Sequence, residues 1–157
     1  MPKQKPGRSK QDYGTPWAFI HAVEKRWGAL DIDLAATEAN AKAPIVITPE
    51  LDTFTFNWRT LQGRRWLNPE FAEIEPWARK CWQETPPGSS TFMLVPASVG
   101  SLWFLLWVFE KARVFFLRPR LTFEGQADSY PKDLILCIYD AMQAPGFETW
   151  DWRQNVA

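Results

Sequence analysis

The segment "RRWLNPEFAEIEPWARKCWQETPPGSSTFMLVP", residues 64–96, carries the clearest fold pattern in this chain. It opens with a short apolar step, "RRWLN", continues through a helical pattern over residues 73–84, and ends in the apolar run of residues 90–96. A strand, a helix and a second strand in this order predict two parallel strands joined by a right-handed crossover. The fold therefore depends on whether the same alternation continues to either side.

The alternation does continue in both directions. Thr15-Pro16 has the form of a helix start, with Thr as the cap and Pro at the first helical position. Together these patterns predict an α/β fold, with an open, mostly parallel sheet. The tail after Asp140 carries Pro, Gly and two tryptophans, and we expect it to pack irregularly. The remaining predicted elements are helices at residues 16–27 and 98–112, and strands at residues 30–34, 43–48, 113–118 and 133–139.

Length and charge limit the organisation and the partners of the chain. Its 157 residues fit one domain around one core, which we place at residues 14–157. Residues 1–13 are rich in Lys, Pro and Gln, and they predict a flexible basic arm. The formal net charge is zero, so the protein has no global field that would attract nucleic acid. Any DNA-binding surface must be a local basic patch.

The cysteine, histidine and hydropathy patterns exclude several classes of protein. Cys81, Cys137 and His21 are the only residues of their types, too few for a disulfide framework or a zinc site. We therefore expect no bound metal, and we expect both cysteines to be small buried hydrophobes. The apolar run of residues 101–109 is too short to cross a membrane, and no signal peptide opens the chain. A cytoplasmic protein without membrane contact is the expectation.

Polar residues stand where the predicted strands end. In an open α/β sheet, ligands bind beyond the carboxyl ends of the strands. Asp33 lies at the end of the first strand, Asn68 at the end of the third and Pro96 at the end of the fourth. Asp52 lies in the loop before the third strand. We expect these four residues to converge on one crevice.

The motif Asn68-Pro69-Glu70-Phe71 has the chemistry to hold an amino-bearing ring. Pro69 forces Asn68 into an extended conformation, so the amide projects from the strand end. The Asn68 side-chain oxygen and the Pro69 carbonyl are then two acceptors for one NH2 group. Phe71 offers a face for stacking, worth ~1–3 kcal/mol per base. Adenine and cytosine satisfy both demands, although an isolated Asn-Pro is also a common turn.

Four stretches together resemble a known family. They are "TPWAFIHAVEKRWGALDIDLAATEANAKAPIVITPELD", "WLNPEFAEIEPWARKC", "FMLVPASVGSLWF" and "KARVFFLRPRLTFEGQADSYPKDLILCIY". In this order they resemble the short phage and prophage DNA adenine-N6 methyltransferases, the Dam-like group. The resemblance implies a minimal, Rossmann-like methyltransferase domain with helices on both sheet faces, which binds S-adenosylmethionine (SAM). It also implies that the protein acts on double-stranded DNA in the cytoplasm of a bacterial host.

The resemblance assigns roles residue by residue. The Asn68-Pro69-Glu70-Phe71 motif corresponds to the family's catalytic motif, which would hold the amino group of a flipped-out adenine. "DLAA", residues 33–36, takes the place of the SAM-binding turn. A carboxylate there can accept from the cofactor's ammonium or hydroxyl groups, and SAM has no phosphate that would need a glycine-rich loop. The residues implied in cofactor binding are Thr15, Pro16, Trp17, Asp33, Ala35 and Asp52. For Trp17, burial in the core is the alternative.

The chain departs from the family pattern at Glu70, where a second proline is usual. This carboxylate points to water, accepts a hydrogen bond from an amino group, or prevents catalysis. Pro119 is a second departure from the family pattern. We predict that the turn around it binds a phosphate, and the alternative is an ordinary solvated turn. The loop and helix-start residues predicted to contact DNA are Ser98, Ser101, Arg118, Arg120 and Lys132.

Three functions remain open on the residues alone. Adenine-N6 methylation is the prediction, and cytosine-N4 methylation uses the same amino-nitrogen chemistry. The third is a phage accessory protein that binds SAM or DNA but has lost catalysis, and it is suggested by Glu70 in the catalytic motif. No segment is long enough to be a separate target-recognition domain. Selectivity must therefore come from the loops, the basic arm or a second subunit, as in a homodimer.

Overall fold

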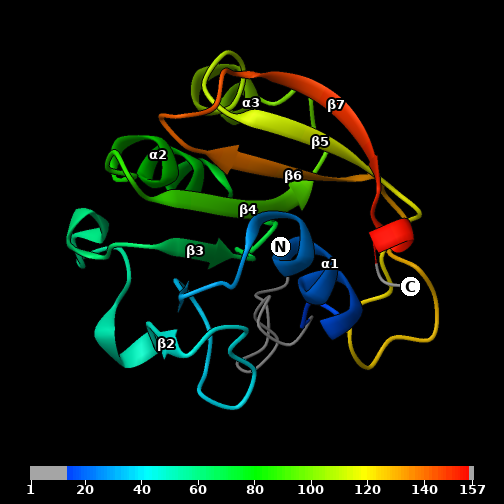
Figure 1. Ribbon diagram of the computed structural model, residues 1–157, viewed down its shortest axis with the longest axis horizontal. Coiled ribbons are helices and arrows are strands. Elements are labelled where there is room, and N and C mark those ends of the chain that lie inside the picture. The colour runs from blue at the N-terminus through cyan, green and yellow to red at the C-terminus, as the bar shows by residue number, and fades with distance from the viewer. Residues whose placement is uncertain (1–13, 156–157) are drawn as a thin grey trace.

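Residues 14–155 are described by a computed structural model, in which they form one mixed seven-stranded sheet (Figure 1). The helices and strands, in chain order, are α1 (Trp17–Trp27), β1 (Ile32–Asp33), β2 (Ile45–Val46), β3 (Arg64–Leu67), α2 (Glu75–Gln83), β4 (Ser90–Pro96), α3 (Leu102–Trp107), β5 (Arg113–Arg118), β6 (Leu134–Tyr139) and β7 (Gly146–Asp151). The short 3-10 turns are η2 (Pro49–Leu51), η3 (Trp58–Thr60) and η4 (Trp152–Asn155). The predicted basic arm, residues 1–13, lies outside the described residues.

The strand order is β2-β1-β3-β4-β6-β5-β7. All neighbouring strands are parallel except β6, which is antiparallel to both β4 and β5. The predicted α/β sheet, open and mostly parallel, is therefore confirmed. The apolar run of β6 had suggested one more parallel strand, because it is buried on both faces. A parallel return needs a crossover element, and the segment between β5 and β6 contains no helix, so the chain returns antiparallel.

Helices cover both faces of the sheet, as predicted (Figure 1). The alternation along β4 shows the two cores: Met93 and Val95 pack in the core under α2 and α3, whereas Phe92 and Leu94 pack under α1. The rings of Phe19, Trp150 and Trp152 fill the second core, with edge or tilted contacts between them. Burial of both faces explains why the central strands are apolar without interruption.

Two predicted elements were wrong. The helix expected over residues 98–112 is reduced to α3, because the chain first turns, with the Ser101 N–H donating to the Ser98 carbonyl. α3 ends where the Phe109 N–H donates to the Phe104 carbonyl, and Glu110 then adopts a left-handed conformation with a φ of 60°. The tail expected to be irregular contains β7, which begins after the Pro-Gly step and pairs with β5 at the edge of the sheet.

Several buried groups fix the relative positions of the elements. The Arg65 guanidinium is fully buried and donates to the Trp58, Leu61 and Glu84 carbonyls, and to two threonine hydroxyls. Burial lowers the pKa of Arg65 to about 10, which leaves it charged at neutral pH. Cys81 and Cys137 are buried thiols, as predicted. Among the helices of residues 14–155, none has the length and hydrophobicity needed to span a bilayer.

Candidate active site

The sheet has a switch point between β1 and β3. From β1 the chain moves outward to β2, and it then returns to the other side of β1 to form β3 and β4. Connections that leave in opposite directions open a crevice at the carboxyl ends of the two strands, where ligands bind in such sheets. Asp33 ends β1 and Asn68 follows β3, so both residues lie at this crevice.

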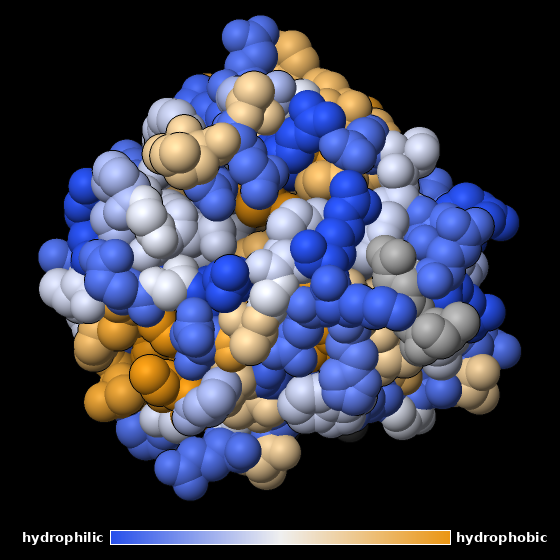
Figure 2. All heavy atoms as spheres, viewed as in Figure 1, coloured by the Kyte–Doolittle hydropathy of each residue, from blue (hydrophilic) through white to orange (hydrophobic). Residues whose placement is uncertain are grey.

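A cavity of about 350 Å³ lies at these strand ends. The segments that follow β1, β2 and β3 supply most of its wall. An apolar patch lies on the surface of the molecule in the region of β2 (Figure 2). The predicted residues Ala35, Asp52 and Glu70 line the cavity together. Its lining does not include Asp33, Asn68 and Pro96, which were expected to converge on one crevice with Asp52, or the predicted cofactor residues Thr15, Pro16 and Trp17. The lining residues that the sequence did not predict are Ala36, Ile47, Thr48, Pro49, Thr53 and Trp77. Ile47 and Thr48 follow β2, so the rule that ligands bind beyond the carboxyl ends of strands would have predicted both.

Glu70 therefore faces a cavity rather than bulk water alone. It is partly buried and shares the cavity lining with Asp52, which is exposed and adopts a left-handed backbone with a φ of 48°. Three buried apolar residues, Ala35, Ile47 and Trp77, also belong to this lining, and we call them its floor. An apolar floor with carboxylates at the rim can accept a planar ring and the hydroxyl or ammonium groups attached to it.

Asp33 is buried and holds the loop after β1 in place. Its Oδ1 accepts from the Ala35 N–H at 3.2 Å, and its Oδ2 accepts from the Lys42 N–H at 2.9 Å. Burial raises the pKa of Asp33 to about 6, although these two hydrogen bonds and the nearby Lys42 charge oppose the rise. A carboxyl group with such a pKa changes its charge within the range where many enzymes work.

The N-terminal motif meets the catalytic motif in space. The Asn68 Nδ2 donates to the Oγ1 of Thr15 at 3.2 Å, and Thr15 is 1% exposed. The predicted cap was wrong: Pro16, rather than Thr15, is the N-cap of α1, and its carbonyl accepts from the first turn of that helix. Trp17 is 45% exposed, so the alternative of burial in the core is wrong. Its ring lies under the Lys42 ammonium, 4.4 Å from the ring centroid.

Phe71 belongs to an aromatic cluster that the sequence did not predict. Its ring meets Phe123 and Tyr130 edge-on, with ring centroids 6.2 and 5.6 Å away, and these two rings also contact each other. Both come from the segment between β5 and β6, which has no periodic pattern from which they could have been predicted. This segment therefore packs directly against the Asn-Pro-Glu-Phe motif.

The predicted DNA contacts lie at the ends of β4, β5 and β6. Ser98 and Ser101 precede α3, so the residues expected to open a long helix form a turn instead. Arg118 pairs with Asp151 at 2.6 Å and Arg120 with Asp133 at 3.0 Å, whereas Lys132 is exposed. Both arginine side chains are largely exposed, so these ion pairs can exchange for phosphate contacts.

A family model described as DNA N-6-adenine-methyltransferase (Dam) matches residues 3–145. The chain belongs to this family. The family confirms the predicted resemblance and the predicted activity, N6-adenine methylation of DNA. It favours adenine over the cytosine-N4 alternative.

Two phage relatives extend the family match. The DNA N-6-adenine-methyltransferase of Haemophilus phage HP1 is 31% identical over 148 residues, which cover 87% of this chain and 84% of the relative. The enzyme of the same name from Escherichia phage T1 is 24% identical over 76% of this chain, which spans only half of that relative. A solved structure of a predicted O-methyltransferase from Agrobacterium tumefaciens covers 55% of this chain at 16% identity, with a TM-score of 0.34. The fold assignment rests on the strand order instead.

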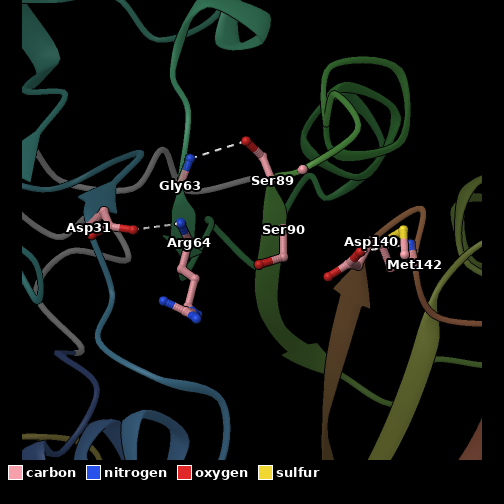
Figure 3. A pocket seen from close by; sticks show the side chains of 8 residues that line it. Asp31, Gly63, Arg64, Ser89, Ser90, Asp140 and Met142 are labelled. Atoms are coloured by element: carbon pink, nitrogen blue, oxygen red, sulfur yellow. Dashed lines mark hydrogen bonds between the residues drawn. The ribbon is translucent and has the colours of Figure 1, made fainter.

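A second cavity, of about 240 Å³, lies at the opposite edge of the sheet (Figure 3). Asp31 and Arg64 line one side, Ser89 and Ser90 lie next to them, and Asp140 lies across from them. The Asp31 Oδ2 accepts from the Arg64 N–H, and the Ser89 Oγ accepts from the Gly63 N–H. These polar groups bind the main chain of neighbouring strands, so they close the amino edge of the sheet.

Proposed function

We propose that this DNA N6-adenine methyltransferase uses SAM, held in the 350 Å³ cavity, as its methyl donor. One observation carries the proposal: Ala35 and Asp52, predicted to bind the cofactor, line a single cavity with Glu70 of the catalytic motif. Its volume lies within the range of small-ligand sites, ~300–1,000 Å³. The apolar floor suits an adenine ring, and the carboxylates suit hydroxyl and ammonium groups. The residues present therefore fit the cofactor.

We assign the reaction centre to Asn68 and Pro69. Bound SAM supplies a methyl group on a positively charged sulfur, which a nucleophilic nitrogen can take directly. The Asn68 side-chain oxygen and the Pro69 carbonyl would accept from the adenine amino group and draw electron density onto its nitrogen as it attacks. Thr15 supports this role, because it receives the Asn68 NH2 and so fixes the orientation of the amide. Alignment supplies most of the acceleration in such a transfer.

The target adenine must leave the DNA helix to reach Asn68, at a cost of a few kcal/mol of stacking and pairing. We assign the stacking surface to Phe71, whose ring is supported by Phe123 and Tyr130. A base that stacks on a ring already held by two neighbours does not have to immobilise that ring first. The segment between β5 and β6 would thus form part of the base pocket.

For Glu70, we propose a role toward the cofactor rather than toward the base. Its carboxylate lines the cofactor cavity with Asp52, so it can accept from a ribose hydroxyl. Glu70, which replaces the usual proline, would then contact the methyl donor rather than the target base. Glu70 then no longer argues for the third alternative, a protein that has lost its catalytic activity.

For the substrate, we propose double-stranded DNA held by Arg118, Arg120 and Lys132 beside the turn of Ser98 and Ser101. Arg118 is the last residue of β5, and the other four residues follow or precede strand ends at the same carboxyl edge of the sheet. Since both relatives are phage proteins, we place the reaction in the cytoplasm of a bacterium that carries phage DNA. Residues 14–157 would act as one catalytic domain.

Purified protein, unmethylated double-stranded DNA and SAM with a labelled methyl group test the proposal. The label should appear in DNA, and nucleoside analysis should find it on N6-methyladenine. Protein that binds SAM but leaves DNA unlabelled would contradict the assigned reaction. Glu70→Gln should raise the KM for SAM several-fold with little change in the KM for DNA, because the acid faces the cofactor. The opposite pattern would move Glu70 to the base.

A further inference from the structure

Lys42 is a buried charge that none of the assigned roles uses. Its side chain is 4% exposed, and its ammonium donates to the Glu124 Oε1 at 2.8 Å. The Trp17 ring lies 4.4 Å from the ammonium, a cation–π contact. Burying an ammonium costs several kcal/mol unless an anion compensates for it. A lysine in this position therefore calls for a negative partner.

The partner that Lys42 has in this structure is exchangeable. Glu124 is 42% exposed and belongs to the irregular segment between β5 and β6. Its carboxylate is accessible to water and can leave the pair when another anion takes its place, whereas Lys42 is held by the contact of its ammonium with Trp17 and by its backbone N–H, which donates to Asp33. The fixed half of the ion pair is thus the cation, and the movable half is a carboxylate.

Lys42 is linked through its backbone to the proposed cofactor cavity, whose lining does not include its side chain. One carboxylate connects the two: Asp33 accepts from Ala35, which lines the cavity, and from the Lys42 backbone N–H. The other ionisable groups at this site, Asp33, Asp52 and Glu70, are acids. They favour the sulfonium and ammonium of SAM but repel its carboxylate, which needs a cation.

We propose that the Lys42 ammonium binds the carboxylate of the methionine part of SAM, and that Glu124 occupies this position until the cofactor arrives. This assignment rests on the proposed use of SAM. Lys42 becomes a cofactor-binding residue that fixes the methionine end, while the apolar cavity fixes the adenosine end. Glu124 keeps the buried charge compensated in the free enzyme.

Decarboxylated SAM provides the test, since it lacks only the group in question. Wild-type protein should bind SAM about 10- to 100-fold more tightly than decarboxylated SAM, as expected for a charge-assisted contact. Lys42→Met should remove this difference by weakening SAM alone, and Lys42→Arg should retain most of it. Titration calorimetry gives both affinities. Retained binding of decarboxylated SAM also shows that the Lys42→Met protein is folded.

Glu124→Gln is the matched control. It removes the competing carboxylate but keeps the side-chain length, so SAM affinity should stay the same or rise. An equal loss of both ligands in Lys42→Met, or equal wild-type affinity for the two, overturns the Lys42 assignment while the use of SAM stands. Wild-type protein that binds neither compound overturns the proposed cofactor and this assignment with it.

Discussion

Asp31 precedes β1 and Asp33 ends it, so the two acids lie two residues apart but at opposite edges of the sheet. Asp31 is exposed at the amino edge and accepts from the Arg64 N–H, a backbone group of the neighbouring strand. Asp33 is buried at the carboxyl edge and accepts from a loop that leaves the sheet. The first carboxylate closes the sheet, whereas the second organises a loop that walls a cavity. Strand direction, rather than residue type, separates the structural acid from the acid beside the proposed cofactor site.

The largest effect should follow from Asn68→Ala at the carboxyl edge. Loss of the amide acceptor should lower kcat by about 1000-fold, by analogy with the loss of one oxyanion-hole contact. SAM affinity should be unchanged. Methyl transfer to DNA and calorimetric SAM binding measure the two quantities. Asp31→Asn at the other edge is the control and should leave kcat unchanged; equal losses in both variants would erase the proposed difference between the edges.

The next effect concerns two neighbouring arginines of β3. Arg65→Met should lower the free energy of unfolding by about 3 kcal/mol, because it leaves several buried carbonyl and hydroxyl groups without their donor. Arg64→Met should change it little, since the Arg64 side chain is exposed. Urea unfolding followed by tryptophan fluorescence gives both values. Similar stability of the two variants would show that the Arg65 contacts do not hold β3 in place.

A smaller effect should appear in the pH dependence of SAM binding. Burial raises the pKa of Asp33 to about 6, so the group takes up a proton as the pH falls through 6. The protonated acid no longer attracts a cationic ligand, and SAM affinity should therefore fall with pH. A single group with this pKa predicts affinity about tenfold weaker at pH 5 than at pH 7.

The matched variants for this pH profile are Asp33→Asn and Asp31→Asn. Asp33→Asn should bind SAM weakly at both pH values, which flattens the profile. Asp31→Asn should keep the wild-type profile, because its carboxylate lies at the other edge of the sheet. A profile that survives in Asp33→Asn would assign the titration to another group.

The smallest effect should come from the proposed DNA surface. Arg120→Gln should weaken DNA binding a few-fold and reduce the slope of log affinity against log salt by ~0.9, the value for one phosphate contact. Arg64→Gln removes the same charge at the amino edge and should leave the slope unchanged. Fluorescence anisotropy at several salt concentrations measures both slopes. Equal slopes in the two variants would remove Arg120 from the DNA surface.

The sequence predicted the elements whose signal is local. β4 and β5 were predicted to the residue, because each is a continuous apolar or β-branched run. α3 and β7 were not. α3 is shortened by local turns on both sides of it, and β7 exists by pairing with β5, more than 30 residues earlier. A pattern within residues 141–157 could not reveal that partner.

The same distinction applies to the site. Asn68, Asp33 and Ala35 could be proposed from the sequence because they stand at or just after the ends of strands with a recognisable motif. Trp77, Phe123 and Lys42 were missed, since each comes from a helix or loop that only the folded chain brings to the strand ends. Glu70 could be recognised in the sequence as a departure from the family motif, but the cavity that it lines could not be predicted.

The burial of both cysteines has a practical consequence for labelling. Burial raises the pKa of Cys81 and Cys137 well above the usual value for a thiol, so the reactive thiolate form is suppressed. The chain has no other cysteine. A cysteine introduced at Met142, which is 86% exposed, can therefore carry a fluorophore while the native thiols stay in place. The protein can therefore be labelled at one chosen position without first replacing its two native cysteines.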